Sequence, residues 1–182
     1  MHLKSKYLIA LNLKMLNMKR ISFLLLAAFV TTLATAAIIY ATNLSGEWTL
    51  NKEKSSFGEF GENIAPKKLT INSADNSITI ERLSPNFQGE DYTTKETLTF
   101  DGKETEIVMF ANNKKKSTAK WSADGQTLLI ASKIFFDING EMTEIKQDET
   151  VKLTPEGQLS VTSVSNSSFG TMEMKLVYDK KK

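Results

Sequence analysis

From Ser45 to the end of the 182-residue chain, short segments of alternating apolar and polar residues are separated by pairs of turn-forming residues. Alternation with a period of two is typical of β-strands with one buried face, because successive side chains point to opposite sides of a sheet. Turn pairs such as Asn-Gly and Asp-Gly supply the positive φ angles of short hairpins. They predict that consecutive strands pair with each other at Asp75-Asn76, Asp101-Gly102, Asn112-Asn113, Asp124-Gly125, Asn139-Gly140 and Glu156-Gly157.

The alternating segments predict about ten strands. They are Gly46–Leu50, Lys67–Asn72, Ser77–Arg82, Tyr92–Phe100, Lys103–Phe110, Lys114–Trp121, Thr127–Phe136, Glu141–Leu153, Gln158–Ser167 and Thr171–Asp179. The pattern contains no helix long enough to cross a parallel sheet, which excludes α/β enzyme folds. Closure into a barrel would remove the unpaired edges of such a sheet. The predicted fold is therefore all-β, an antiparallel up-and-down meander closed into a barrel.

The first forty residues differ from the rest. Residues 18–36 have the three parts of a secretory signal peptide, namely a basic start, an apolar stretch and a small-residue cleavage site ending at Ala36. Ala41 is an alternative cleavage point. Residues 1–17 add nothing that such a signal requires, so we interpret them as a start-site extension. We expect an N-terminal signal helix followed by one barrel domain, residues 45–182.

The predicted signal peptide is compatible with two locations of the protein. Removal of the signal would place the protein in the periplasm or outside the cell, with no stable membrane span afterwards. Residues 21–41 are also close to the roughly 20 residues that cross a bilayer, so N-terminal anchoring in the inner membrane stays open as the alternative. Cleavage after Ala36 would leave 146 residues, a length that fits one domain.

Charge and residue usage exclude several function classes. Five of the 23 basic residues precede Glu47, so the remainder carries 18 basic and 21 acidic groups. A mildly acidic domain with scattered lysines is not typical of a nucleic-acid-binding protein. The chain has no cysteine, and His2 is its only histidine. The domain therefore has no Ser-His or Cys nucleophile and no His- or Cys-ligated metal site, and we expect no cofactor.

The remaining motifs have simpler structural explanations. Ser117-Thr118-Ala119-Lys120 spells the S-x-x-K motif of penicillin-recognising enzymes, but on a strand its serine and lysine point to opposite faces. Residues 137–141 resemble a calcium loop and fit a hairpin turn better. Glu104 and Glu106 are expected on a solvated face. The runs 114–116 and 180–182 are interpreted as solvated lysines, with a partner patch as the alternative.

Strand parity assigns the inward face, which mixes apolar with polar residues. Polar groups that are buried and unpaired cost roughly 1–3 kcal/mol each, so they favour a water-containing cavity or a barrel mouth. Strand-end positions or a slipped register would also explain them, and Arg82 could be an exposed strand-end charge. The cavity candidates are Arg82, Thr94, Glu96, Leu98, Phe100, Ile130, Ser132, Ile145, Gln147, Glu149, Met172, Met174 and Tyr178. Phe57, Phe60 and Ile64 are interpreted as a flap over the mouth.

From Ser45 onward the chain resembles the calycin barrels, the group of lipocalins and fatty-acid-binding proteins, and most closely the lipocalin-like domains of exported bacterial proteins. The resemblance rests on Gly46-x-Trp48, on the sequential hairpins, and on the final segment 175–180. It implies a barrel in which Gly46 permits a close bend and Trp48 plugs the closed end, both in structural roles.

The chain departs from that pattern in three places. Fatty-acid-binding proteins hold the ligand carboxylate with an arginine two residues before the last-strand tyrosine, and Leu176 stands there. Lipocalins stack a last-strand basic residue on the tryptophan, and here only Lys175, on the opposite parity from Leu176, is expected to be available. The segment after the first strand is also too short for a two-helix lid. The resemblance therefore predicts a barrel without the usual carboxylate anchor.

The functional hypothesis is a binding protein and not an enzyme. We expect it to sequester or carry a small apolar or amphipathic ligand inside the barrel. Met172 and Met174 would make the wall adaptable. The alternative is a filled barrel that acts as a structural, protein-binding or inhibitor module of the cell envelope, so a protein partner stays possible. A carboxylate-based hydrolase that uses Glu96 or Glu149 is the third hypothesis.

Overall fold

The computed structural model describes residues 41–182 except 87, 139, 140 and 169, and it leaves out the side chains of residues 59, 60 and 138. The predicted start-site extension, signal helix and cleavage site at Ala36 lie outside the described residues. Ala41, the alternative cleavage point, is the first residue described. Within the described part of the chain, no helix is long and apolar enough to cross a membrane.

The described residues form one ten-stranded antiparallel sheet, which confirms the predicted all-β meander. The strands are β1 (Gly46–Leu50), β2 (Lys68–Ala74), β3 (Ser77–Pro85), β4 (Asp91–Thr99), β5 (Thr105–Val108), β6 (Lys114–Trp121), β7 (Thr127–Ile138), β8 (Glu141–Leu153), β9 (Leu159–Ser167) and β10 (Gly170–Lys180). Three short 3-10 helices are η1 (Lys52–Lys54), η2 (Gly58–Ile64) and η3 (Phe110–Asn112).

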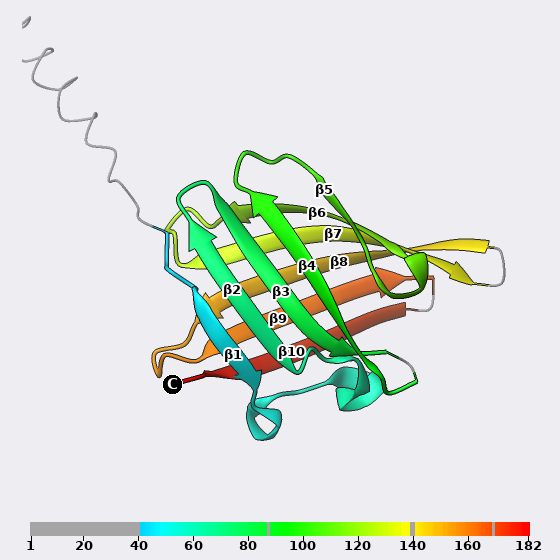
Figure 1. Ribbon diagram of the computed structural model, residues 1–182, viewed down its shortest axis with the longest axis horizontal. Helices are drawn as coiled ribbons and strands as arrows, with labels where there is room; N and C mark the ends of the chain where they lie inside the picture. The colour runs from blue at the N-terminus through cyan, green and yellow to red at the C-terminus, as the bar shows by residue number, and fades with distance from the viewer. Residues whose placement is uncertain (1–40, 87, 139–140, 169) are drawn as a thin grey trace, which may run out of the picture. The chain divides into compact units, whose positions relative to one another are not determined.

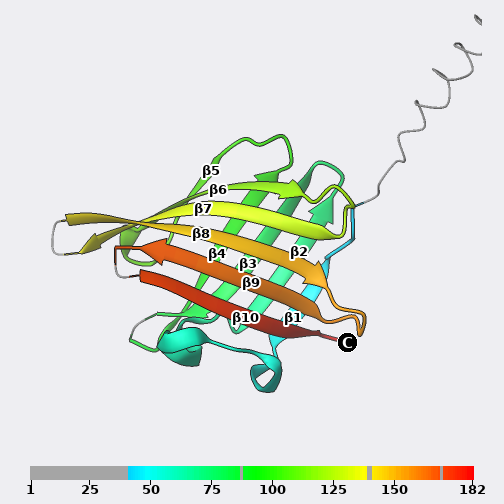
Figure 2. The ribbon, with the colours of Figure 1, turned by 180° about the vertical axis from the view of Figure 1, so that it is seen from behind.

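The sheet curls into a nearly closed, calycin-like barrel. Its strand order is β4-β3-β2-β1-β10-β9-β8-β7-β6-β5, so β1 pairs with β10, and consecutive strands pair everywhere except between β4 and β5. Figure 1 shows the layer of β1 to β4 crossing in front of the layer of β6 to β10, and Figure 2 shows the reverse side. The two edge strands, β4 and β5, are not joined by a ladder. The Thr105 hydroxyl on β5 donates to the Thr97 carbonyl on β4 at 3.1 Å.

One predicted strand is shorter in the structure. The segment predicted as Lys103–Phe110 forms strand only over Thr105–Val108, because Ala111 and Asn112 have φ angles of 57° and 60° and turn the chain back. Such left-handed angles are uncommon outside glycine, and they end the extended backbone. The Phe110 carbonyl accepts from the Asn113 amide at 3.3 Å and closes this turn into β6.

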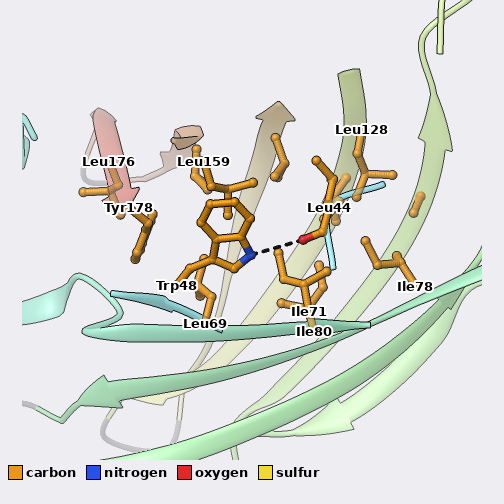
Figure 3. Close-up of a cluster of buried hydrophobic side chains, with 14 of the residues drawn as sticks. Leu44, Trp48, Leu69, Ile71, Ile78, Ile80, Leu128, Leu159, Leu176 and Tyr178 are labelled. Atoms are coloured by element: carbon orange, nitrogen blue, oxygen red, sulfur yellow. Dashed lines mark hydrogen bonds between the residues drawn. The ribbon is translucent and has the colours of Figure 1, made fainter. Parts of the chain in front are cut away.

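Apolar side chains fill one end of the barrel, which we call the apolar end and define by Leu44, Trp48, Ile78, Leu128 and Leu159. All five are buried (Figure 3). The Trp48 indole N–H donates to the Leu44 carbonyl at 3.1 Å, so its polar atom is satisfied. Residues 42–45 cross this end, because the Thr42 amide donates to the Gly125 carbonyl at 2.9 Å.

The stacking partner of Trp48 corrects the expectation that only Lys175 was available. Lys180 is the residue opposite Trp48 on the neighbouring strand, and its Nζ lies 5.3 Å from the centre of the tryptophan ring. A Cβ atom on Gly46 would lie 2.8 Å from the Lys180 side chain, and Gly46 has a φ of 150°. Gly46 therefore leaves the space that Lys180 needs to lie across Trp48.

Candidate functional site

A cavity of about 140 Å³ lies inside the barrel, above the apolar core. Leu69, Ile71 and Val161 belong both to that core and to the cavity wall. Ile64 from η2, Tyr92 at the start of β4 and Met109 after β5 also line the cavity. These three side chains come from segments at the end of the barrel opposite Trp48. The cavity therefore has an apolar floor and an apolar rim.

Four charged side chains lie between floor and rim, and we call Arg82, Glu96, Lys115 and Glu149 the charged cluster. Glu96, Lys115 and Glu149 are only 2%, 5% and 8% exposed. The Arg82 guanidinium forms ion pairs with both carboxylates, directly with Glu96 and at 3.2 Å with Glu149. The Lys115 ammonium lies 3.1 Å from Glu96 and 3.8 Å from Glu149. Each charge thus has partners of opposite sign.

Hydroxyl and amide groups extend the charged cluster across the sheet. The Ser117 hydroxyl donates to the second oxygen of Glu96 at 3.1 Å and lies 2.9 Å from the Ser132 hydroxyl. The Gln147 amide donates to the hydroxyls of Ser163 and Ser165 at 3.0 and 3.4 Å. These serines are buried, and hydrogen bonding is what makes buried hydroxyls tolerable.

Glu96 and Arg82 stay charged despite their burial, because they lie beside partners of opposite charge. Burial would raise the pKa of the Glu96 carboxyl, but Arg82 and Lys115 outweigh burial and lower that pKa to about 2. Burial opposes the charge on Arg82, yet the carboxylates of Glu149 and Glu96 raise the pKa of its guanidinium. Burial raises the pKa of the Tyr178 hydroxyl, which donates to the Pro66 carbonyl at 3.1 Å. Glu96 and Arg82 therefore remain a carboxylate and a guanidinium at neutral pH.

The predicted cavity residues fall into three groups. Six of them line the cavity: Arg82, Thr94, Gln147, Glu149, Met174 and Tyr178. Glu96 and Ser132 are buried but do not line the cavity. Glu96 accepts from the lining residue Lys115, and the Ser132 hydroxyl lies 2.9 Å from the Ser117 hydroxyl. Leu98 and Ile130 belong to the apolar core. Phe100 packs edge-on to Trp121 with ring centres 5.9 Å apart, and Met172 packs against the core. Ile145 is the register partner of the lining residue Ile134 but does not itself line the cavity.

The predicted flap is attached to the barrel wall. Ser56 pairs with Lys175 on β10 through two backbone hydrogen bonds of 2.7 and 2.8 Å. Phe57 packs against the core, and Ile64 lines the cavity. The side chain of Phe60 lies outside the described residues. Of these residues, Ile64 is the one that the structure places over the cavity.

The interpretation of Lys115 as a solvated charge is wrong. Lys115 shares the inward face of β6 with Ser117 and Ala119, while its neighbours Lys114 and Lys116 form surface ion pairs with Glu106 and Glu104. The parity of Ser117, Ala119 and Trp121 already pointed Lys115 inward, so the signal was present in the sequence. Tyr92, Ile107 and Met109 were also missed, because they lie at strand ends, where a period of two gives little information.

The charged cluster is better suited to holding a ligand than to transferring protons. A general acid needs a pKa near the working pH, and Glu96 is held as a carboxylate far below it. Among the described residues, no group of three or more histidine, cysteine, aspartate or glutamate side chains could hold a metal ion. Arg82, Lys115 and Glu149 place hydrogen-bonding and charged groups in the cavity wall.

No protein-family model and no curated protein matches the sequence. Among solved structures, the chain is similar to the zebrafish ileal bile acid-binding protein in its complex with cholic acid. That similarity has a TM-score of 0.47 and a sequence identity of 16%, and it covers 75% of this chain and 98% of that chain. The fold and the site described above rest on the strands and side chains of this chain itself.

Proposed function

We propose that the barrel binds one small amphipathic molecule in the cavity. Its polar end would contact Arg82, Lys115 and Glu149, and its apolar part would lie under Ile64 and Tyr92. The observation that carries the proposal is the cavity wall, which places buried charges inside and apolar side chains at the floor and rim. Ligand sites are commonly apolar pockets with a few polar groups that fix orientation.

The size of the cavity limits the ligand. A volume of about 140 Å³ is below the ~300–1,000 Å³ of a drug-sized site. The polar end and the first carbons of a ligand fit this space. A longer chain would have to pass the apolar rim formed by Ile64, Tyr92 and Met109. We therefore expect a single-chain amphiphile.

Export and the lipocalin-like subtype belong to the same proposal. The signal pattern of residues 18–36 supports export, and Gly46-x-Trp48 with Lys180 stacked on the indole supports the subtype. Intact-mass measurement of the protein recovered from expressing bacteria tests whether the signal is cleaved on export. A mass that starts after Ala36 or Ala41 would support cleavage, while a mass that retains residues 18–36 would contradict it.

A matched pair of substitutions tests the binding site. Thr94 lines the cavity, whereas Thr93 is exposed on the other face of β4. Thr94→Phe should fill the cavity and abolish binding of octanol, octanoate and octylamine by calorimetry and native mass spectrometry, while Thr93→Phe should leave it unchanged. If none of the three probes binds the wild-type full chain, or if Thr94→Phe binds equally well, the cavity is not the ligand site.

A second candidate is a barrel that binds a protein partner through its rim. Val108 and Phe110 are 61% and 38% exposed, and Phe110 packs on Tyr92 with ring centres 5.7 Å apart. Apolar side chains at a rim are one feature of interaction surfaces. This candidate predicts that the probes do not bind and that Phe110→Ser weakens capture of the partner without lowering the melting temperature.

A further inference from the structure

The charge balance of the cluster selects the kind of ligand headgroup, an inference that rests on the proposed function. Arg82 and Lys115 carry two positive charges, and Glu96 and Glu149 carry two negative charges within the same buried network. Glu149 lines the cavity with the two cations, while Glu96 lies behind the wall. The site is therefore neutral before any ligand enters.

A charged headgroup would upset this balance. A carboxylate would add a third negative charge beside Glu149, and an ammonium would add a third positive charge beside Arg82 and Lys115. Either would lose its hydration in a site without a spare counter-charge, and an uncompensated buried charge is strongly unfavourable. Leu176, which is buried and lines the cavity, is apolar and supplies no further positive charge for a carboxylate.

The cluster nevertheless retains hydrogen-bond donors. A guanidinium has five N–H groups and an ammonium has three. Among the described residues, Arg82 donates to Glu96 and to Glu149, and Lys115 donates to Glu96. The distance of 3.8 Å from Lys115 to Glu149 is too long for a hydrogen bond. Both cations therefore have N–H groups left for an acceptor oxygen in the cavity that they line.

We propose that the ligand's polar end is uncharged and carries an acceptor oxygen, as in an alcohol, an ester or an ether. Such an oxygen accepts from Arg82 or Lys115 and leaves the cluster neutral. The binding order in the wild-type full chain should then be octanol above octanoate and octylamine, three probes with the same number of carbons. We expect a difference of about tenfold or more in Kd, measured by calorimetry at neutral pH.

Removing one charge should reverse this preference. Glu149→Gln leaves two cations and one carboxylate, so octanoate should gain more affinity than the wild-type difference between the two probes and overtake octanol. Lys115→Met leaves one cation and two carboxylates, so octylamine should gain instead. Glu144→Gln, at an exposed position of the same strand, is the matched control and should keep the wild-type order.

The outcomes separate the two proposals. Wild-type protein that binds octanoate or octylamine as tightly as octanol overturns the headgroup inference and leaves the proposed function standing. Absence of binding by all three probes overturns the proposed function as well. Should Glu149→Gln fail to fold, Lys115→Met tests the same rule with the opposite sign, and the wild-type order decides the inference without any variant.

Discussion

The two ends of the barrel interior are filled in opposite ways. The apolar end contains no charge, and its indole N–H is satisfied by the Leu44 carbonyl. The other half buries the charged cluster. Burying a large apolar side chain stabilises a fold by about 1.5–3 kcal/mol, whereas a buried ion network is often no more stabilising than well-packed apolar residues. The gain in folding stability is therefore a sufficient reason for the apolar end. It is not a sufficient reason for the charged cluster.

The largest effect should come from emptying the apolar end. Trp48→Ala removes the largest side chain of that end, and Trp-to-Ala changes in a core cost about 3–5 kcal/mol. We expect a loss of that size in the free energy of unfolding, measured in urea. The affinity of the folded variant for octanol should be unchanged, because Trp48 does not line the cavity. Loss of stability below 1 kcal/mol would show that Trp48 does not hold this end together.

Breaking the charged cluster should cost somewhat less. Glu96 accepts from Arg82, Lys115 and Ser117, and Glu96→Gln leaves the two cations with one carboxylate. We expect a loss of about 3 kcal/mol in unfolding free energy, the low end of the range for a broken buried pair, because glutamine keeps the shape. Glu106→Gln, which breaks an exposed ion pair, should change little. Equal effects of the two variants would contradict the buried cluster.

Lowering the pH should remove the stabilisation that the paired Glu96 carboxylate gives to the fold. The pKa of Glu96 is lowered in the folded protein to about 2, so its stabilisation is fully present above the unfolded value of about 4.5 and is lost as pH falls toward 2. The contribution is on the order of 3 kcal/mol. The stability gap between wild type and Glu96→Gln should therefore close between about pH 4.5 and pH 2. A gap that stays constant over this range would mean that Glu96 is not held as a paired carboxylate.

The smallest effect should come from the contact between Lys180 and the Trp48 ring. Lys180→Met keeps the length of the side chain and removes the charge that lies 5.3 Å from the ring centre. An exposed cation–π contact contributes about 0.5–1 kcal/mol, and we expect a loss of that size in the free energy of unfolding. Lys175→Met is the control and should have no such effect, since Lys175 points away from this contact. A larger loss for Lys175→Met than for Lys180→Met would support the expectation that Lys175 is the residue that stacks on Trp48.

Strand parity and turn residues predicted most of the fold, because a period of two and a positive φ are local properties of the sequence. The same parity placed Glu96, Glu149 and Arg82 on the inward face. It could not show that Glu149 meets the other two, because β8 approaches the paired strands β3 and β4 only when the barrel closes. Lys115 was misjudged because it stands between two surface lysines, and Lys180 because its partner is fixed by the pairing of β1 with β10.

The most direct test of a binding role for the charged half is an NMR titration of the isotope-labelled full chain with octanol. Saturable shifts are expected for amides around the cavity on β3, β4, β6 and β8, near Arg82, Thr94 and Lys115. The indole N–H signal of Trp48 should stay in place. Absence of saturable shifts, or shifts concentrated at Trp48 and its apolar neighbours, would contradict the assignment of the charged half as the ligand site.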